Sequence, residues 1–139
     1  RHYAAFTLVG DAEIAEGSVW EAIAFASDHS LSNLIAIVDR NRLSVTEALE
    51  DDAIFHNFKG KMEAFGWACL EVDGHSYPAI MNALEQSRGA DRPTMVLANT
   101  IKGKGVSFME NVLKWHHAVP SQSEVEIARR ELGLEGCAS

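Results

Sequence analysis

Asp11 and Asn41 are the two residues whose types and spacing most clearly suggest chemistry. Each comes shortly after a short apolar run, residues 3–9 in the first case and 34–38 in the second. Ligands of parallel α/β sheets bind beyond the carboxyl ends of the strands, so the two side chains converge if these runs form neighbouring strands. A carboxylate and an amide oxygen make a hard, oxygen-only donor pair, which suits Mg²⁺ shared with substrate phosphates.

The same two residues also have a purely structural interpretation. Asp11 can cap a helix, and Asn41 can form a turn. In support of the metal site, a helix that begins near Glu16 could add N–H groups and the positive end of its dipole towards an anion. Spacing alone leaves the metal site and the structural interpretation open.

The apolar periodicity predicts the elements that position these residues. Short apolar runs predict buried strands at 3–9, 34–38, 67–72 and 94–98. Helical spacing predicts helices at 16–29, 57–66, 77–88 and 121–132. Ser121 and Glu124 are spaced as a capping box at the start of the last helix.

This alternation of strands and helices predicts an α/β fold, with a parallel sheet covered by helices on both faces. The whole chain, residues 1–139, is expected to form a single domain. Four aromatic residues at helical spacing are expected in its core, namely Trp20, Phe25, Phe58 and Phe65. Because the chain opens with Arg1 and enters an apolar run at once, we expect it to be part of a larger domain or of a split protein.

Composition disfavours several functional classes. Twenty acidic against twelve basic side chains give a net charge of −8, which argues against nucleic-acid binding. No apolar run approaches the roughly 18–20 residues of a membrane helix. The two cysteines, Cys69 and Cys137, lack metal-site spacing and suit a reducing, cytoplasmic setting. A Rossmann dinucleotide site is disfavoured because no GxGxxG follows the first strand.

Two further groups of residues lie after the third and fourth predicted strands. His75 either faces the cleft or, as we expect, serves as a structural loop residue. Lys102 and Lys104 lie in a glycine-rich loop where phosphate contact is conceivable, although the spacing is not that of a Walker A motif.

Several segments together resemble the transketolase family. Gly10-Asp11, the helix with Glu16-Gly17, and Asn41 after the second strand resemble the thiamin diphosphate motif, a GDG followed at a distance by Asn. Sequence segments typical of the family are also found at residues 64–67, 72–75 and 102–111, at Trp115-His116 and at Pro120. The resemblance extends over nearly the whole chain and is greatest to the N-terminal subunit of bacterial two-chain transketolases.

The resemblance implies a thiamin diphosphate-binding fold of the diphosphate-binding type, lacking its N-terminal part, and it implies a ligand set. Asp11 and Asn41 would give side-chain oxygens to Mg²⁺, and Leu43 would give its backbone carbonyl. Gly10, Ala12 and Glu13 would belong to the cofactor site, with Ala12 in the place of the motif's second glycine.

The resemblance also implies a histidine that approaches the diphosphate and the substrate. Counting back three residues from Pro120 selects His117, the residue we favour for this contact with the cofactor, whereas counting from Trp115 selects His116. Glu16 matches a family glutamate at the contact between two cofactor sites, which implies assembly about a two-fold axis.

Two departures from the family pattern stand at the expected cofactor site. Ala12 makes the motif GDA, and its methyl group crowds a bound phosphate unless the φ angle there is negative. Arg42 stands where the family often has glycine.

The implied activity is transfer of a two-carbon ketol unit between sugar phosphates. The glutamate that activates the cofactor belongs to a separate pyrimidine-binding domain, so the chain is expected to be inactive without a C-terminal, pyrimidine-binding partner chain. Alternatives are a component of another thiamin enzyme, resembling deoxyxylulose phosphate synthase or a 2-oxoacid dehydrogenase, and a non-catalytic assembly module that has lost the chemistry.

Overall fold

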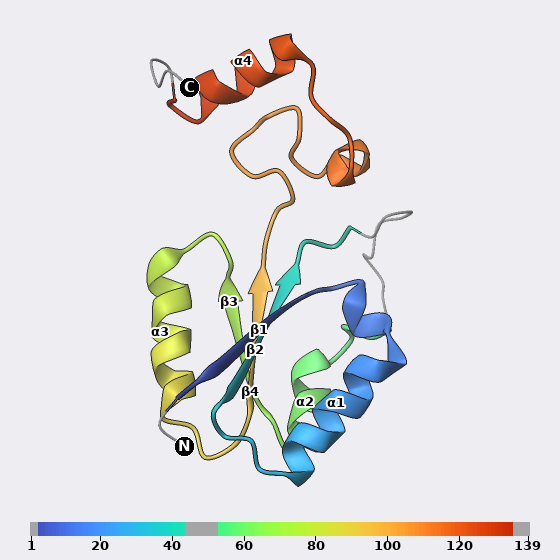
Figure 1. The fold of residues 1–139 in the computed structure, drawn as a ribbon, viewed down its shortest axis with the longest axis vertical. Coiled ribbons are helices and arrows are strands. Elements are labelled where there is room, and N and C mark those ends of the chain that lie inside the picture. Colours follow the sequence, from blue (N-terminus) through green and yellow to red (C-terminus); the bar gives the residue numbers. More distant parts are fainter. Residues whose placement is uncertain (1–2, 44–52, 135–139) are drawn as a thin grey trace.

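The computed structural model describes residues 3–43 and 53–134, and Cys137 lies outside this part of the chain. Four parallel strands form one sheet in the order β1-β2-β4-β3 (Figure 1). They are β1 (Ala5–Gly10), β2 (Leu34–Arg40), β3 (Ala68–Asp73) and β4 (Thr94–Asn99). The predicted α/β class is confirmed, and each strand lies within about two residues of its expected position, the ordinary uncertainty of such boundaries.

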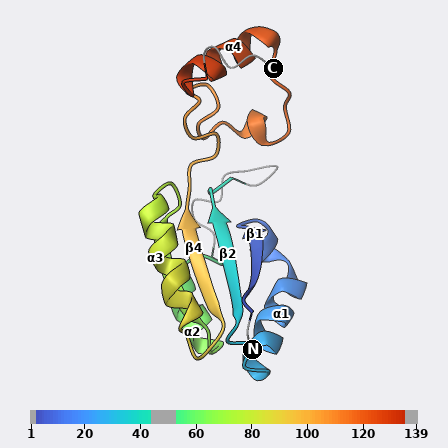
Figure 2. The same ribbon diagram turned by 60° about the vertical axis from the view of Figure 1, so that its left-hand side comes forward.

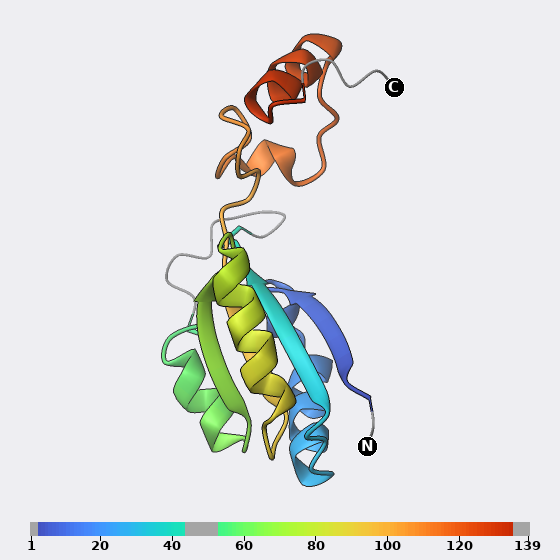
Figure 3. The same ribbon diagram turned by 90° about the vertical axis from the view of Figure 1, so that its left-hand side faces the viewer.

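The strand order explains why helices cover both faces of the sheet. The chain moves in one direction across the sheet from β1 to β2 to β3, through α1 (Gly17–Asp28) and α2 (Phe58–Ala64). It then reverses from β3 to β4 through α3 (Tyr77–Arg88). Because such crossovers are right-handed, reversal places the helix on the opposite face. Figures 2 and 3 show α1 and α2 on one face and α3 on the other.

The two faces of the sheet carry separate hydrophobic clusters. Alternate residues of β2 point to opposite faces, so Ala36 and Val38 pack with α1 and α2, whereas Ile35 packs with α3. Met62 of α2 is fully buried in the larger cluster. Trp67 is buried there too, and its indole Nε1 donates to the Ile23 carbonyl at 2.9 Å, which joins α1 to the start of β3.

The chain after β4 extends beyond the carboxyl ends of the strands. It contains the 3₁₀ helix η2 (Leu113–His116) and the helix α4 (Gln122–Glu131), which Figure 1 shows apart from the sheet. The predicted capping box is confirmed: the Ser121 hydroxyl accepts from the Glu124 N–H, and the Glu124 carboxylate accepts from the Ser121 N–H. This segment therefore stands at the edge of the sheet where ligands are expected.

The expected burial of the first strand is wrong. Phe6 is 49% exposed and Leu8 is 70% exposed. They pair in register with Ile35 and Ile37 and so face the side of the sheet that α3 covers. β1 is an edge strand, and α3 packs on β3 and β4 at the other side of the sheet, which leaves these two side chains uncovered.

Two of the four aromatic residues expected in the core are also exposed. Phe58 is buried and Trp20 packs against the core, as predicted. Phe25 is instead 57% exposed and stacks on the His29 ring, with the two ring centroids 3.9 Å apart. Phe65 is 37% exposed because it lies just past the end of α2. Helical spacing alone does not show how much of each helix surface is covered by the sheet.

In the ranges 3–43 and 53–134, none of the helices combines the length and the apolar character that crossing a bilayer would require.

Two methionines provide a matched test of this packing. We expect Met62→Ala to lower the free energy of unfolding by about 2–5 kcal/mol, because it leaves a cavity in the core. Met81 on α3 is 55% exposed, so Met81→Ala should change this free energy by no more than about 0.5 kcal/mol. Urea denaturation of the full chain measures both values, and equal losses would contradict the assigned core.

Candidate functional site

The pairing of β1 with β2 brings the two candidate metal ligands to one edge of the sheet. Gly10 is in register with Asp39, and the next backbone N–H, that of Asp11, donates to the Asp39 carbonyl at 3.2 Å. Asn41 follows β2 directly. Two segments thirty positions apart in the sequence are therefore adjacent at the carboxyl ends of neighbouring strands, as the spacing predicted.

The Asp11 side chain joins these two segments. It is only 2% exposed, and one carboxylate oxygen, Oδ2, accepts from the Arg42 N–H at 2.6 Å. The other oxygen, Oδ1, accepts from the Ala12 N–H at 2.9 Å. Burial raises the pKa of the Asp11 carboxyl, and the nearby Asp39 charge acts in the same direction, although the two N–H donors oppose the shift.

The residues after β2 adopt a turn in which glycine would be favoured at position 42, where this chain has arginine. The φ angle of Arg42 is 62°, in the left-handed region that glycine adopts most easily. This turn directs the Arg42 N–H to Asp11, while the Asn41 side-chain oxygen accepts from the Leu43 N–H at 3.0 Å. A glycine at position 42 would form the same turn without a side chain in a strained conformation.

The GDA departure is compatible with the backbone at this position. Ala12 has φ −66° and ψ −32°, an ordinary right-handed conformation that does not require glycine. The Glu13 carboxylate accepts from the Gly10 N–H at 2.6 Å. The Ile14 carbonyl accepts from the Trp20 indole at 2.7 Å, which anchors the segment to α1. Gly10, Ala12 and Glu13 are thus held in a fixed turn beside Asp11.

A cavity of about 470 Å³ opens beside the turn at residues 41–43, and residues 10–13 are not among those that line it. Its lining comes from the ends of β2, β3 and β4 and from the loop after β4. The lining residues are Asn41, Arg42, Leu43, Asp73, His75, Asn99, Thr100, Ile101 and Asn111. The polar edge expected at the carboxyl ends of the strands therefore encloses a space large enough for a small ligand.

The donors beside the cavity have the chemistry of a hard cation site. A carboxylate offers about four lone-pair positions, and hydrogen bonds to Asp11 use two of them. Within residues 3–43 and 53–134, no cluster of three or more His, Cys, Asp or Glu residues could hold a metal ion. That search covers only these four residue types, so it does not bear on a set made of one carboxylate, one amide and one carbonyl.

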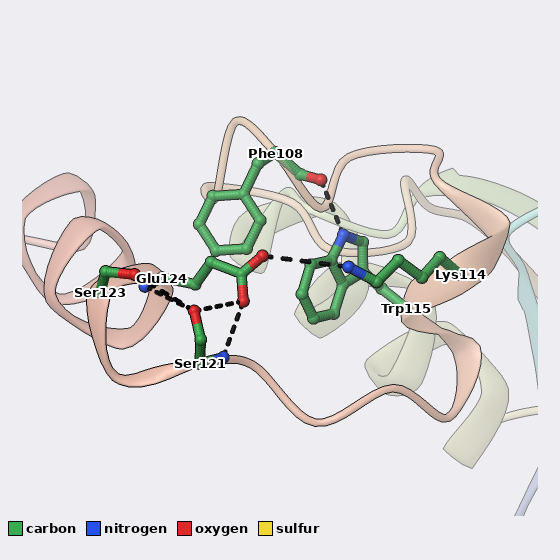
Figure 4. Close-up of polar contacts among 6 residues, drawn as sticks. All are labelled: Phe108, Lys114, Trp115, Ser121, Ser123 and Glu124. Carbon is green, nitrogen blue, oxygen red and sulfur yellow. Dashed lines mark hydrogen bonds and ion pairs between the residues drawn. The ribbon is translucent and has the colours of Figure 1, made fainter.

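His116 and His117 do not line this cavity. They lie at the end of η2, where the Trp115 indole donates to the Phe108 carbonyl at 2.8 Å (Figure 4). Lys114 lies over the Trp115 ring and 3.9 Å from a Glu124 oxygen, so η2 is tied to α4. His117 is exposed. His116 is half-buried, and its Nδ1 is buried with no hydrogen-bond partner among the described residues.

The other candidate residues have simpler surroundings. Glu16 is exposed at the start of α1 and makes no side-chain cap there. Lys104 lies 3.6 Å from Glu110 in an ion pair within the loop. Lys102 is half-buried, and its carbonyl accepts from the Asn111 N–H at 3.0 Å.

Asn111 is a lining residue to which the sequence reasoning gave no role. It reaches the cavity because the loop after β4 folds back at Gly103, whose φ angle is 77°. A side-chain carbon at Gly103 would stand 2.6 Å from the Met109 carbonyl oxygen, so the return depends on glycine. The glycine spacing marks a loop, but no local pattern indicates where the loop returns.

The parallel sheet and its polar carboxyl edge define a ligand-binding α/β domain. A family model described as "Transketolase, thiamine diphosphate binding domain" matches residues 1–139, and the chain belongs to this family. The resemblance noted in the sequence is therefore confirmed.

Curated relatives include single subunits of two-chain transketolases. The chain is 37% identical over 131 residues to one subunit of the apulose-4-phosphate transketolase of Phocaeicola vulgatus, covering 94% of this chain and 47% of that protein. It is 38% identical over 132 residues to the SqwG subunit of the 6-deoxy-6-sulfo-D-fructose transketolase of a Clostridium species, covering 94% and 48%. It is 41% identical over 114 residues to human transketolase, covering 82% and 18%.

Solved transketolases share the fold. The structure of transketolase from Campylobacter jejuni matches with a TM-score of 0.89 at 31% identity, covering 99% of this chain and 22% of that one. Transketolase from Pichia stipitis in complex with sedoheptulose-7-phosphate matches with a TM-score of 0.85 at 26% identity, covering 94% and 19%. The chain spans about half the length of the relatives from two-chain transketolases and about a fifth of the longer transketolases.

Two substitutions at position 42 test the strained turn. Arg42→Gly should stabilise the chain by about 1 kcal/mol relative to Arg42→Ala, because only glycine relieves the left-handed backbone. Both variants remove the guanidinium group, so their difference isolates the backbone from the charge. Thermal and urea unfolding measure this difference, and equal stability of the two variants would show that the turn is not strained.

Proposed function

We infer that this domain holds the diphosphate of thiamin diphosphate through a magnesium ion. The Asp11 and Asn41 side-chain oxygens and the Leu43 backbone carbonyl would be the protein's ligands to the metal. The observation that carries this inference is the 2.6 Å hydrogen bond from the Arg42 N–H to Asp11, which joins the two halves of the motif beside the cavity. Membership of the thiamin diphosphate-binding family supports the choice of this cofactor.

The residues around Asp11 fit this role. The buried carboxylate carries a raised pKa, and a divalent cation beside it would offset the cost of keeping the charge out of water. Gly10, Ala12 and Glu13 form the turn next to it, and their backbone would be part of the diphosphate site. The bound cofactor supplies a nucleophilic carbon for the reaction, while the protein supplies placement and electrostatics.

A histidine of the η2 segment would bind the oxygen of the donor sugar. His116 and His117 are the two candidates, and the buried, unpartnered Nδ1 supports His116 because such an atom ordinarily has a partner. The exposed ring of His117 leaves it free to turn towards a substrate.

The reaction that fits these parts is transfer of a two-carbon ketol unit between sugar phosphates. Relatives named as single subunits of transketolases imply a second chain, and a C-terminal, pyrimidine-binding subunit would complete this enzyme. The exposed Glu16 would lie at the contact between two cofactor sites across a two-fold axis. The buried, free thiol of Cys69 is consistent with a reducing, cytoplasmic setting.

Cofactor binding tests this proposal directly. The full chain is mixed with a transketolase chain of the pyrimidine-binding type and titrated with thiamin diphosphate and Mg²⁺ in a calorimeter. Saturable binding that needs Mg²⁺ is expected for the wild type. Asp11→Ala should weaken it at least about a hundredfold, as loss of a buried charged ligand costs about 3–5 kcal/mol.

Asp91→Ala is the matched control, because it removes an exposed carboxylate from the turn between α3 and β4 at the opposite end of the sheet. It should bind like the wild type. Equal binding by the Asp11 and Asp91 variants would refute the metal assignment. Absence of any binding by the wild type would favour the non-catalytic assembly module.

The raised pKa of Asp11 gives a second test by pH. In the metal-free chain, a folded-state pKa above the unfolded value of 3.8 means that this group's contribution to stability is lost as pH rises through the folded pKa. Wild type should therefore lose stability relative to Asp11→Asn as pH rises above 3.8. Urea denaturation across this range, with both chains free of metal, measures the difference.

Adding Mg²⁺ and thiamin diphosphate to the assembled complex at neutral pH should raise the stability of the wild type and leave the Asn variant nearly unchanged. A stability difference that is flat with pH, or the same gain for both chains, would argue against an ionised Asp11 holding the metal.

A further inference from the structure

His75 occupies the turn that follows β3, and that turn is fixed to the end of β4. The Gly74 N–H donates to the Asn99 carbonyl at 2.8 Å, and the His75 N–H donates to the Asp73 carboxylate at 2.9 Å. A side chain at position 74 would collide with Thr100, so glycine permits this close approach. The His75 ring is thus carried to the cavity by a rigid turn.

The His75 ring bonds to the neighbouring loop rather than to its own. Its Nε2 accepts from the Ile101 backbone N–H at 2.7 Å. A ring nitrogen accepts a hydrogen bond only when it carries no proton, so this bond requires the form of the ring in which Nε2 is unprotonated. The side chain therefore joins the loop after β3 to the loop after β4.

The residue next to Ile101 continues the connection to the proposed metal ligands. The Thr100 N–H donates to the Arg40 carbonyl at 3.0 Å, and the Thr100 hydroxyl donates to the Asp39 carboxylate. The Asp39 carbonyl in turn accepts from the Asp11 N–H. These hydrogen bonds, joined by the covalent backbone at residues 100–101 and by Asp39 itself, connect His75 through the ends of β4 and β2 to Asp11.

We propose that His75 is a positioning residue for the cofactor site. Its Nε2 holds residues 100 and 101 against the end of β2 by accepting from the Ile101 N–H, and this holds Asp39 and Asp11 in the arrangement that binds the metal and the diphosphate. The inference rests on the proposed function and adds a residue that acts through the protein backbone. A direct contact between the ring and the ligand is the rival interpretation.

Two amide variants separate these roles. Gln places its side-chain oxygen near the position of Nε2, so His75→Gln can still accept from the Ile101 N–H. Asn is shorter and reproduces the position of Nδ1, so His75→Asn cannot reach it. The two variants are matched in polarity and charge, and they differ in which ring nitrogen they replace.

The first measurement is amide hydrogen exchange at Ile101 in the assembled complex without cofactor. His75→Asn should speed exchange at Ile101, whereas His75→Gln should leave it near the wild-type rate. The second is calorimetric affinity for thiamin diphosphate with Mg²⁺. Loss of one hydrogen bond predicts affinity about threefold to tenfold weaker for His75→Asn, with His75→Gln within about twofold of the wild type.

Each result other than the expected one overturns the proposal in a recognisable way. Unchanged exchange in His75→Asn means that the ring does not hold the loop. Faster exchange with wild-type affinity means that the bond is local and does not position the site. If His75→Gln binds the cofactor weakly while His75→Asn keeps the wild-type affinity, a direct contact between Nδ1 and the ligand is indicated. If both variants lose the same affinity, a hydrogen-bond acceptor at the position of Nε2 is not sufficient for binding. If the wild type itself binds no cofactor, the proposed function fails before the variants are compared.

Discussion

The buried Asp11 carboxylate is the constraint on which the rest of the site depends. A charge this far from water needs donors or a cation, and the structure supplies two backbone N–H groups. One of them, from Arg42, comes from the segment after the neighbouring strand, so the carboxylate stabilises the junction of β1 and β2. The same burial raises its pKa, which makes a divalent cation a natural counter-charge.

The sheet order turns this local junction into a site. The reversal between β3 and β4 inserts β4 between β2 and β3, so loops from three distant parts of the sequence meet at the cavity that Asn41, Arg42 and Leu43 line. The loop after β4 then carries η2 and α4 beyond the sheet, where Trp115, Lys114 and Glu124 hold the segment with the candidate histidines.

Several features could be predicted because they depend on short-range physics. The elements followed from apolar periodicity, and the α4 cap followed from Ser121 and Glu124 three residues apart. The exposure of Phe6, Leu8 and Phe25 could not be predicted in this way. Whether an apolar side chain is covered depends on which element lies across from it, and the strand order that places β1 at the edge is a long-range property. For the same reason, no local pattern placed Asn111 at the cavity.

By itself, the sequence determined the types of oxygen donor, their spacing after two strands and the family they resemble, because these properties reside in residue identities and their order. Only the tertiary structure decided that the Asp11 carboxylate accepts from the Arg42 N–H. It also decided the backbone angles, which are right-handed at Ala12 and left-handed at Arg42. It also decided that His75 bonds to Ile101. Backbone angles and contacts between loops depend on how distant strands pair, and pairing is settled by the packing of the whole domain.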